Sequence, residues 1–520
     1  MTESAPSAPR ERPSYWLTRF LVLRVLGLVY LAAFASLAWQ VLPLLGEGGL
    51  LPAAAWLERI QASAGSRLDG FLLSPSWFWL GASDPVLLGA ALLGVALSLP
   101  LLFGFANAIQ LALLWSLQLS VLQIGQLWYG YGWEIQLAET GFLAIFLCPL
   151  ASARAFPASP PPLAVIWLLR WLIFRIMLGA GLIKLRGDPC WSDLTCLFYH
   201  YETQPIPNPV SRFFHFLPHP VLQAGVLMNH AAELVAPWFM LGPRRVRHAA
   251  GAVMLAFQAM LIASGNLSFL NWLTIVPILA CFDDSLLRRV LPRALTLRAE
   301  RAASAARTSR AQGILATALV ALIALLSVAP VLNLVSDRQV MNTSFDRFSL
   351  VNTYGAFGSV GRERDEIVFE GTADEQPSPS SEWRAYEFPC KPGDPTRRPC
   401  VVSPWQPRLD WQIWFAAMAT PSDYPWTLHF VWKLLQGDRG LLRLLANDPF
   451  PQQPPRWVRA RYYRYQFAPP GDPSGAWWSR VLIGDWLPPL SAGDPRLRES
   501  LIRLGWLEPG DPGAPPRTPR

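Results

Sequence analysis

The chain has 520 residues, of which 52% are hydrophobic and only 15% are charged, against about 25% charged residues in an average soluble domain. Its mean hydropathy is +0.26 and its formal net charge is +8. Most arginines stand in short clusters between apolar runs, a pattern that sets the topology of membrane proteins. The positive charge is therefore no sign of nucleic-acid binding, and an ordinary soluble protein is excluded.

Apolar runs recur through the first two thirds of the chain. A hydrocarbon core of about 30 Å requires roughly 20 apolar residues in a helix. After the polar segment 1–13, which we expect to be a disordered cytoplasmic tail, the sequence predicts a multi-span transmembrane domain at 14–336. Its nine or so predicted spans lie at 16–44, 85–103, 106–127, 134–150, 163–185, 221–241, 248–264, 267–282 and 312–334.

The Arg-rich segments predict the orientation of these spans, because cytoplasmic loops carry an excess of Lys and Arg. Arg10 and Arg12 precede the first span, and further arginines crowd the segments 244–247 and 283–311. Nine spans that begin in the cytoplasm place all of these segments on the cytoplasmic side. The same count places the chain after residue 336 outside the cytoplasm.

The sequence after residue 337 predicts an extracytoplasmic α+β domain at 337–490, followed by a largely disordered tail at 491–520. No apolar run here is long enough to span a membrane. Strands are expected at 366–370, 384–388 and 456–467, and helices at 408–419 and 426–446. The chain as a whole is thus predicted to be a polytopic α-helical membrane protein with a C-terminal extracytoplasmic α+β domain.

Two close cysteine pairs fall in segments that are predicted to lie outside the cytoplasm. Cys190 pairs in sequence with Cys196, and Cys390 with Cys400. On an oxidising side, such pairs predict two structural disulfides. The nearby histidines match no usual zinc spacing, so we expect neither a metal nor a cofactor.

Ionisable residues within predicted spans are candidates for function, because their burial is costly. They are Glu139, Lys184, His230 and Glu233. His230 and Glu233 are three residues apart and share a helix face, so they could perform acid–base chemistry or tie two helices together. These four residues are the catalytic candidates if the chain is a membrane enzyme that acts on a lipid, a quinone or an exported peptide. That alternative loosely resembles the carboxylase-like membrane proteins in architecture alone.

The segment 187–220 is polar and aromatic and lacks a helix or strand pattern. Loops of this length are usually functional or disordered, and the aromatic content argues against disorder. We expect a fixed structure at the membrane surface that offers a client site. The candidate residues are Trp191, His200, Tyr201 and Glu202.

Four long segments resemble the lipase maturation factors: Ser14–Phe34, Trp128–Leu150, Leu182–Pro209 and Leu350–Thr372. The resemblance implies a chaperone-like protein rather than an enzyme, which assists the folding and assembly of secreted lipases. It also implies client binding by the C-terminal domain, which adds Leu350, Asn352 and Tyr354 to the candidates.

The resemblance implies a location in the endoplasmic reticulum membrane, with the C-terminal domain in the lumen. The composition, rich in Pro, Ala and Arg, is typical of a bacterial gene of high GC content. In a bacterium the corresponding location is the inner membrane, with the C-terminal domain in the periplasm. The expected partners are membrane lipids and an exported client protein such as a lipase, with no nucleic acid.

Overall fold

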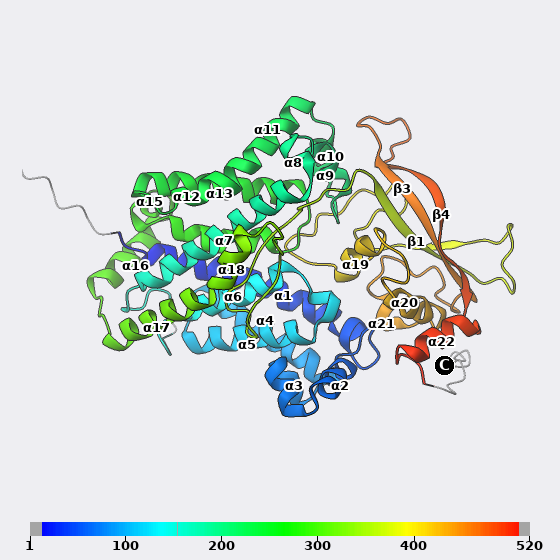
Figure 1. Ribbon diagram of the computed structural model, residues 1–520, viewed down its shortest axis with the longest axis horizontal. Coiled ribbons are helices and arrows are strands. Elements are labelled where there is room, and N and C mark those ends of the chain that lie inside the picture. The colour runs from blue at the N-terminus through cyan, green and yellow to red at the C-terminus, as the bar shows by residue number, and fades with distance from the viewer. Residues whose placement is uncertain (1–12, 153, 509–520) are drawn as a thin grey trace, which may run out of the picture.

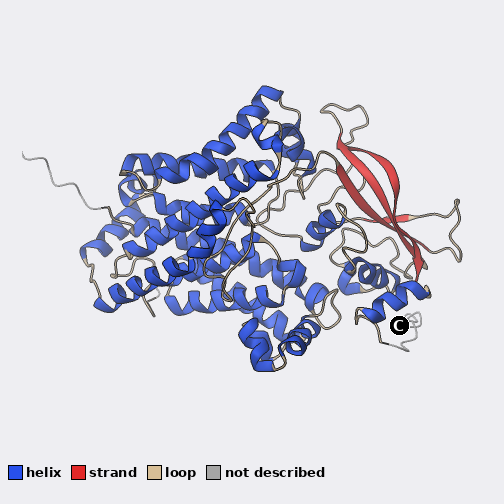
Figure 2. Cartoon of the chain, in the orientation of Figure 1, coloured by secondary structure: helices blue, strands red, loops and turns tan. Residues whose placement is uncertain are grey.

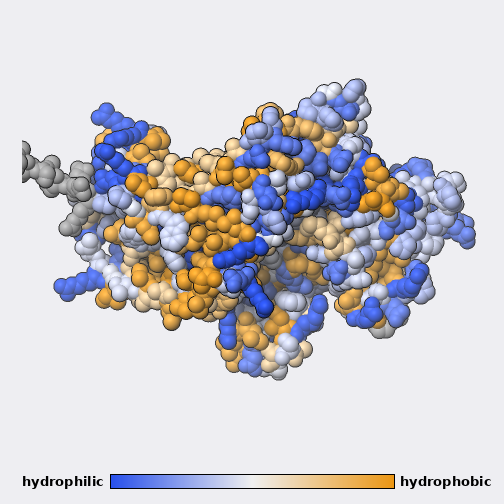
Figure 3. Space-filling model, turned by 45° about the horizontal axis from the view of Figure 1, so that its top comes forward, coloured by the Kyte–Doolittle hydropathy of each residue, from blue (hydrophilic) through white to orange (hydrophobic). Residues whose placement is uncertain are grey.

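A bundle of long helices forms one end of the molecule and a four-stranded sheet stands at the other (Figures 1 and 2). The computed structural model describes residues 13–152 and 154–508. The predicted tail at 1–13 lies outside the described residues except for Pro13. Apolar side chains cover much of the flank of the bundle, while the sheet end is more hydrophilic (Figure 3).

The first half of the bundle is formed by long helices and by a pair of short helices that projects from its side (Figure 1). Its elements are α1 (Trp16–Leu45), α2 (Ala53–Ala64), α3 (Arg67–Leu73), α4 (Asp84–Phe103), α5 (Ala108–Ile124), α6 (Gly132–Ile145) and α7 (Leu163–Gly187).

The second half continues with α8 (Pro189–Ser192), α9 (Leu197–Thr203), α10 (Pro209–His215), α11 (His219–His230), a π-helical turn (Ala231–Val235), α12 (Ala236–Phe239), α13 (Arg244–Ser264), α14 (Leu270–Ile278), α15 (Asp284–Val290), α16 (Arg293–Ser304), α17 (Arg310–Leu326) and α18 (Val328–Val335). Short 3₁₀ turns lie at Trp77–Leu80, Gln126–Tyr129 and Leu279–Cys281.

Five helices in the described part of the chain are long and apolar enough to cross a membrane: α1, α4, α7, α13 and the continuous stretch Arg310–Val335. A sixth span exists if α14 and α15, which are bent by 118° at their junction, are counted as one. The predicted count of nine is not confirmed. The predicted spans at 134–150 and 221–241 correspond to the short α6 and to a helix that the π-helical turn interrupts.

Neighbouring helices of the bundle meet at its two ends, as contacts of α5 with α6 and of α13 with α14 show. At the end far from the sheet, the Ala108 amide at the start of α5 donates to the Pro149 carbonyl after α6, and Arg244 at the start of α13 pairs with Asp283 after α14. At the sheet end, Asn266 after α13 donates to the Cys400 carbonyl. The Arg-rich helices α15 and α16 lie at the end of the bundle opposite the sheet (Figure 1).

The segment 187–220 contains three short helices, although its sequence shows no helix pattern. The Asp188 carboxylate accepts from the Cys190 amide at the start of α8, and Asn208 caps α10 in a reciprocal capping box. Such caps stabilise helix starts. Helices of four to seven residues are too short to produce a clear apolar period, which is why the pattern was missed.

The C-terminal domain is an antiparallel sheet with helices between it and the bundle (Figure 2). The strand order is β2-β1-β3-β4, and helices α19 and α20 contact β1 and β3 respectively. The elements are β1 (Arg364–Thr372), β2 (Arg384–Tyr386), α19 (Arg408–Ala416), α20 (Trp426–Leu435), α21 (Arg439–Leu442), β3 (Trp457–Phe467), β4 (Trp478–Ser491) and α22 (Pro495–Arg503).

The end of this domain differs from the prediction. Strand β4 was not expected, because Gly484 and the pair Pro488–Pro489 interrupt any strand-like alternation. The predicted disordered tail at 491–520 is wrong for residues 495–503, which form α22 with Leu497 and Leu501 buried. Residues 509–520 lie outside the described part of the chain.

Candidate functional site

Buried ion pairs connect the bundle to the C-terminal domain. We call this region the junction: the sheet-side parts of α6 and α7, the segments 187–204 and 349–366, and α19. Charged groups removed from water must be paired and hydrogen-bonded to be tolerated. The junction satisfies that requirement with partners from distant parts of the sequence.

Glu139 on α6 is at the centre of the first ion-pair cluster. It pairs with Arg175 on α7, and its Oε2 accepts from the Asn352 amide at 3.0 Å, the Asn352 side chain at 3.1 Å and the Tyr354 hydroxyl at 2.7 Å. Arg175 in turn donates to the Asn352 carbonyl at 2.7 Å. All four residues are buried, and Leu350 is buried in the neighbouring core. Burial and the adjacent carboxylate raise the pKa of Tyr354 well above its usual value, so its hydroxyl remains a proton donor.

A second pair joins α6 to α19. The Arg408 guanidinium contacts Glu134 Oε1 at 2.7 Å and donates to the Trp128 carbonyl at 2.6 Å. Gln118 on α5 donates to the other Glu134 oxygen at 2.8 Å. Both charged side chains are fully buried, so the first turn of α19 is anchored to the bundle.

The third cluster contains the predicted residues Lys184, His230 and Glu233. Lys184 Nζ contacts Glu233 Oε1 at 2.6 Å and Asn229 Oδ1 at 2.9 Å. His230 Nε2 instead lies 3.0 Å from the Trp191 carbonyl oxygen. The predicted His230–Glu233 pair is therefore replaced by a Lys184–Glu233 pair, because the π-helical turn that starts at Ala231 alters the helical spacing.

The client-site candidates of the segment 187–220 are buried as well. Trp191 Nε1 donates to the Phe357 carbonyl at 2.9 Å, and the His200 ring lies edge-on to Phe357. Glu202 Oε2 accepts from the Phe467 amide at 2.6 Å, and Tyr201 is buried in the cluster around the Cys190–Cys196 disulfide. Burial, with a contribution from Lys184, lowers the pKa of His200 to about 4, so the ring is neutral at neutral pH.

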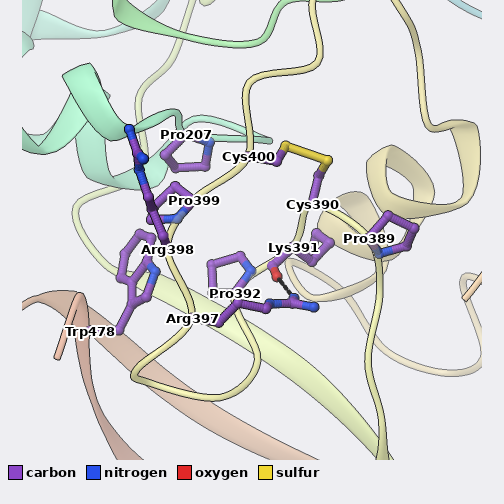
Figure 4. A pocket seen from close by; sticks show the side chains of 10 residues that line it. All are labelled: Pro207, Pro389, Cys390, Lys391, Pro392, Arg397, Arg398, Pro399, Cys400 and Trp478. Carbon is purple, nitrogen blue, oxygen red and sulfur yellow. Dashed lines mark hydrogen bonds between the residues drawn. A yellow bond between two sulfur atoms is a disulfide. The ribbon is translucent and has the colours of Figure 1, made fainter. Parts of the chain in front are cut away.

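Both predicted disulfides are present. The Cα atoms of Cys190 and Cys196 are 4.8 Å apart, and those of Cys390 and Cys400 are 5.3 Å apart. The second disulfide borders a shallow pocket, with Pro207, Pro399 and Trp478 across from it (Figure 4). Pro207 comes from the bundle and Trp478 from β4, so this disulfide holds the loop 391–399 where the two parts of the molecule meet.

The chemistry of the junction is that of a structural connection. The Glu139 carboxylate accepts from three donors in addition to its pairing with Arg175. No group of three His, Cys, Asp or Glu side chains in the described ranges could hold a metal ion. Ion pairs whose carboxylates are held by several protein donors from different elements hold those elements in place.

Sequence reasoning identified the members of these pairs unequally. Arg175 lies within the apolar run 163–185, which is itself a signal of function. Arg408 and Glu134 carried no comparable signal, because one lies in an amphipathic helix of the C-terminal domain and the other at the very start of a predicted span. Only the packing of α19 onto α6 makes them partners.

Comparison with known proteins covers both halves of the molecule. The model of the lipase maturation factor transmembrane domain matches residues 17–289, and that of the lipase maturation factor C-terminal domain matches residues 350–488. Lipase maturation factor 1 of Bos taurus is 49% identical over 93% of this chain and 90% of its own length. The Homo sapiens protein of the same name is 45% identical over 97% of this chain and 95% of its length.

A more distant relative is lipase maturation factor 2 of Homo sapiens, 31% identical over 96% of this chain and 86% of its own length. No solved structure matches the chain. The two family models together cover both the bundle and the sheet, and the relatives align along nearly the whole length. The chain belongs to the lipase maturation factor family.

Proposed function

We propose that the chain is a membrane-embedded, chaperone-like maturation factor whose client is an exported lipase. The observation that carries this proposal is that the chain has both family domains at up to 49% identity to proteins named lipase maturation factor 1. The occupied ion pairs of the junction support a role in positioning rather than in catalysis.

The proposal includes nine membrane crossings and a C-terminal domain outside the cytoplasm. The helices of the pairs α5–α6 and α13–α14 run in opposite directions, and the Arg-rich helices α15 and α16 lie at the end opposite the sheet (Figure 1), as an excess of cytoplasmic positive charge requires. The two disulfides lie toward the sheet end and are compatible with an oxidising compartment. That compartment is the lumen of the endoplasmic reticulum, or the periplasm if the source is bacterial.

The client contact is expected on the exposed edge of the sheet rather than at the buried junction. Among the described residues, strand β4 pairs only with β3, and its residues Val481, Leu482 and Ile483 are all exposed. Proteins usually protect such an edge with charge, proline or a covering element. The unpaired backbone groups and apolar side chains of β4 suit an extended segment of a partly folded client, which would add as a further strand.

Co-expression with an exported lipase tests the proposal. The full chain should raise the activity of the secreted lipase per unit of lipase protein. Val481→Lys combined with Ile483→Lys should abolish that gain while the chain remains abundant and monodisperse. Val401→Lys, at another exposed apolar position, is the matched control and should act like the unchanged protein.

The outcomes test the maturation role and the client contact on β4 separately. If the intact chain fails to raise lipase activity for any exported lipase of its source, the maturation role is wrong. If the intact chain is active and the doubly substituted β4 variant is equally active, only the docking edge is wrong.

A further inference from the structure

An apolar groove runs along the flank of the bundle on helix α7. Its volume is about 460 Å³, within the range of small-molecule sites. Helix α7 provides the floor, Leu241 after α12 provides one wall and Val320 of α17 provides the other. The floor residues are Ala164, Trp167, Leu168, Arg170, Trp171 and Phe174.

The groove matches one leaflet of a bilayer in length. The floor extends over the eleven residues from Ala164 to Phe174 of a continuous helix, a rise of about 15 Å along the helix axis. That is half of a hydrocarbon core of about 30 Å. The acyl chain of one lipid in a single leaflet would therefore fill the groove from end to end.

The polar group beneath the groove is already satisfied by protein partners. Arg170 Nε donates to the Ala280 carbonyl at 2.9 Å, and its Nη2 donates to the Tyr15 hydroxyl at 2.8 Å. The guanidinium also stacks over the Trp167 ring at 4.7 Å. Because the charged head is turned into the protein, the wall of the groove is apolar and suits a hydrocarbon chain rather than a polar ligand.

The walls are continuous with the apolar flank of the bundle. Trp167, Leu241 and Val320 are all exposed there, where the proposed function places membrane lipid. Water cannot occupy such a groove without losing hydrogen bonds, and an empty groove would leave aromatic surface without contacts. The surrounding bilayer supplies the one abundant ligand of suitable shape, an acyl chain.

Charge at the Ala164 end of the groove selects the head group. Gln312 on α17 contacts the Pro160 carbonyl just before α7, so the start of α17 lies beside the start of α7. Arg310 is exposed there and has no ion pair within the described ranges. Arg245, four residues after the wall residue Leu241, is also exposed and forms no ion pair in that part of the chain. Free cations at the mouth of an apolar groove attract a lipid phosphate.

We propose that this groove is a binding site for one anionic phospholipid, with an acyl chain along α7 and the phosphate near Arg310 and Arg245. The site lies at the end of α7 that is far from the C-terminal domain, in the proposed cytoplasmic leaflet. It borders the junction at Trp171, whose ring lies 5.6 Å from the Arg175 guanidinium, and it does not include the proposed client edge. It would hold α17, which packs mainly on α7 and α18, against the rest of the bundle.

Native mass spectrometry of the full chain in mild detergent with added dioleoyl-phosphatidylglycerol tests the proposal. The unchanged protein should retain one lipid after detergent exchange. Ala164→Phe fills the floor and should lose it, and so should Val320→Trp, which narrows the groove from the exposed wall. Ala96→Phe, at an exposed position of α4 outside the groove, is the matched control and should retain the lipid.

A head-group test separates the phosphate contact from the acyl contact. Arg310→Gln should weaken retention of phosphatidylglycerol more than that of zwitterionic phosphatidylcholine. The proposal is overturned if the monodisperse groove-filling variants retain the lipid as the unchanged protein does. It is also overturned if the unchanged protein retains none, or if cholesterol replaces phosphatidylglycerol at equal concentration.

Discussion

Ion pairs of the same chemical type occur in two contrasting places in this molecule. At the junction, Glu139–Arg175 and Glu134–Arg408 are fully buried. On the sheet, Arg464–Glu363 and Arg461–Asp485 are partly open to water. Water screens the pairs on the sheet, so each of them contributes little to the free energy of unfolding. Removing one partner at the junction leaves a buried charge without compensation.

The contrast explains what each region can do. The junction fixes the C-terminal domain on the bundle, because breaking any one of its pairs is costly. Substitutions on the sheet surface cost little stability, so this surface can be adapted to bind a client. Substitutions that alter one charge in each region make this difference measurable.

The largest effect is expected for Glu139→Gln. It leaves the Arg175 guanidinium buried without a carboxylate, and the free energy of unfolding should fall by about 3–5 kcal/mol. Thermal unfolding in detergent and the yield of monodisperse protein measure it. Glu363→Gln, the same chemical change at the exposed pair, is the control and should change unfolding little.

Replacing both members of the buried pair sharpens the comparison. Glu139→Leu combined with Arg175→Met removes both charges, so the double variant should be more stable than Glu139→Gln alone. An unfolding temperature of Glu139→Gln equal to that of the unchanged protein would contradict this stabilising role. Loss of lipase-maturing activity from such a stable variant would instead favour the enzyme alternative.

Acidification should give an intermediate effect at the junction. The pKa of His200 in the folded protein is lowered to about 4 from a usual value of 6.5, by burial and by Lys184. Between these values the unfolded chain binds more protons than the folded one, so stability is lost as the pH falls through this window. When the pH falls from 7 to 5, His200 should lower the free energy of unfolding by about 2 kcal/mol.

The His200→Gln variant isolates that contribution from other titrating groups. Its thermal unfolding midpoint should fall less between pH 7 and pH 5 than that of the unchanged protein. Parallel pH profiles for the two proteins would show that His200 is not held neutral by its surroundings.

The smallest effect is expected for Arg461→Gln on the sheet. Its partner Asp485 is half exposed, so the free energy of unfolding should change by about 0–1 kcal/mol, and less at high salt. Chemical denaturation at two salt concentrations measures this. A loss as large as that of Glu139→Gln would remove the distinction between the two regions.

Local sequence determined the features that depend on neighbouring residues. The apolar runs identified a membrane domain, because a span needs consecutive apolar residues in one segment. The cysteine pairs identified both disulfides, since each pair is close in sequence. The charged residues within the spans, such as Glu139 and Lys184, were recognisable one by one because burying a charge is costly.

Tertiary structure alone decided which of these groups meet. Glu139 contacts Asn352 and Tyr354 across more than 200 residues of sequence, and Arg408 reaches Glu134 across 274. Lys184 rather than His230 pairs with Glu233, because of a π-helical turn that no periodicity revealed. Residue patterns record the environment of each segment, but partners far apart in sequence are set by how the folded segments pack, and that packing built both the junction and the groove on α7.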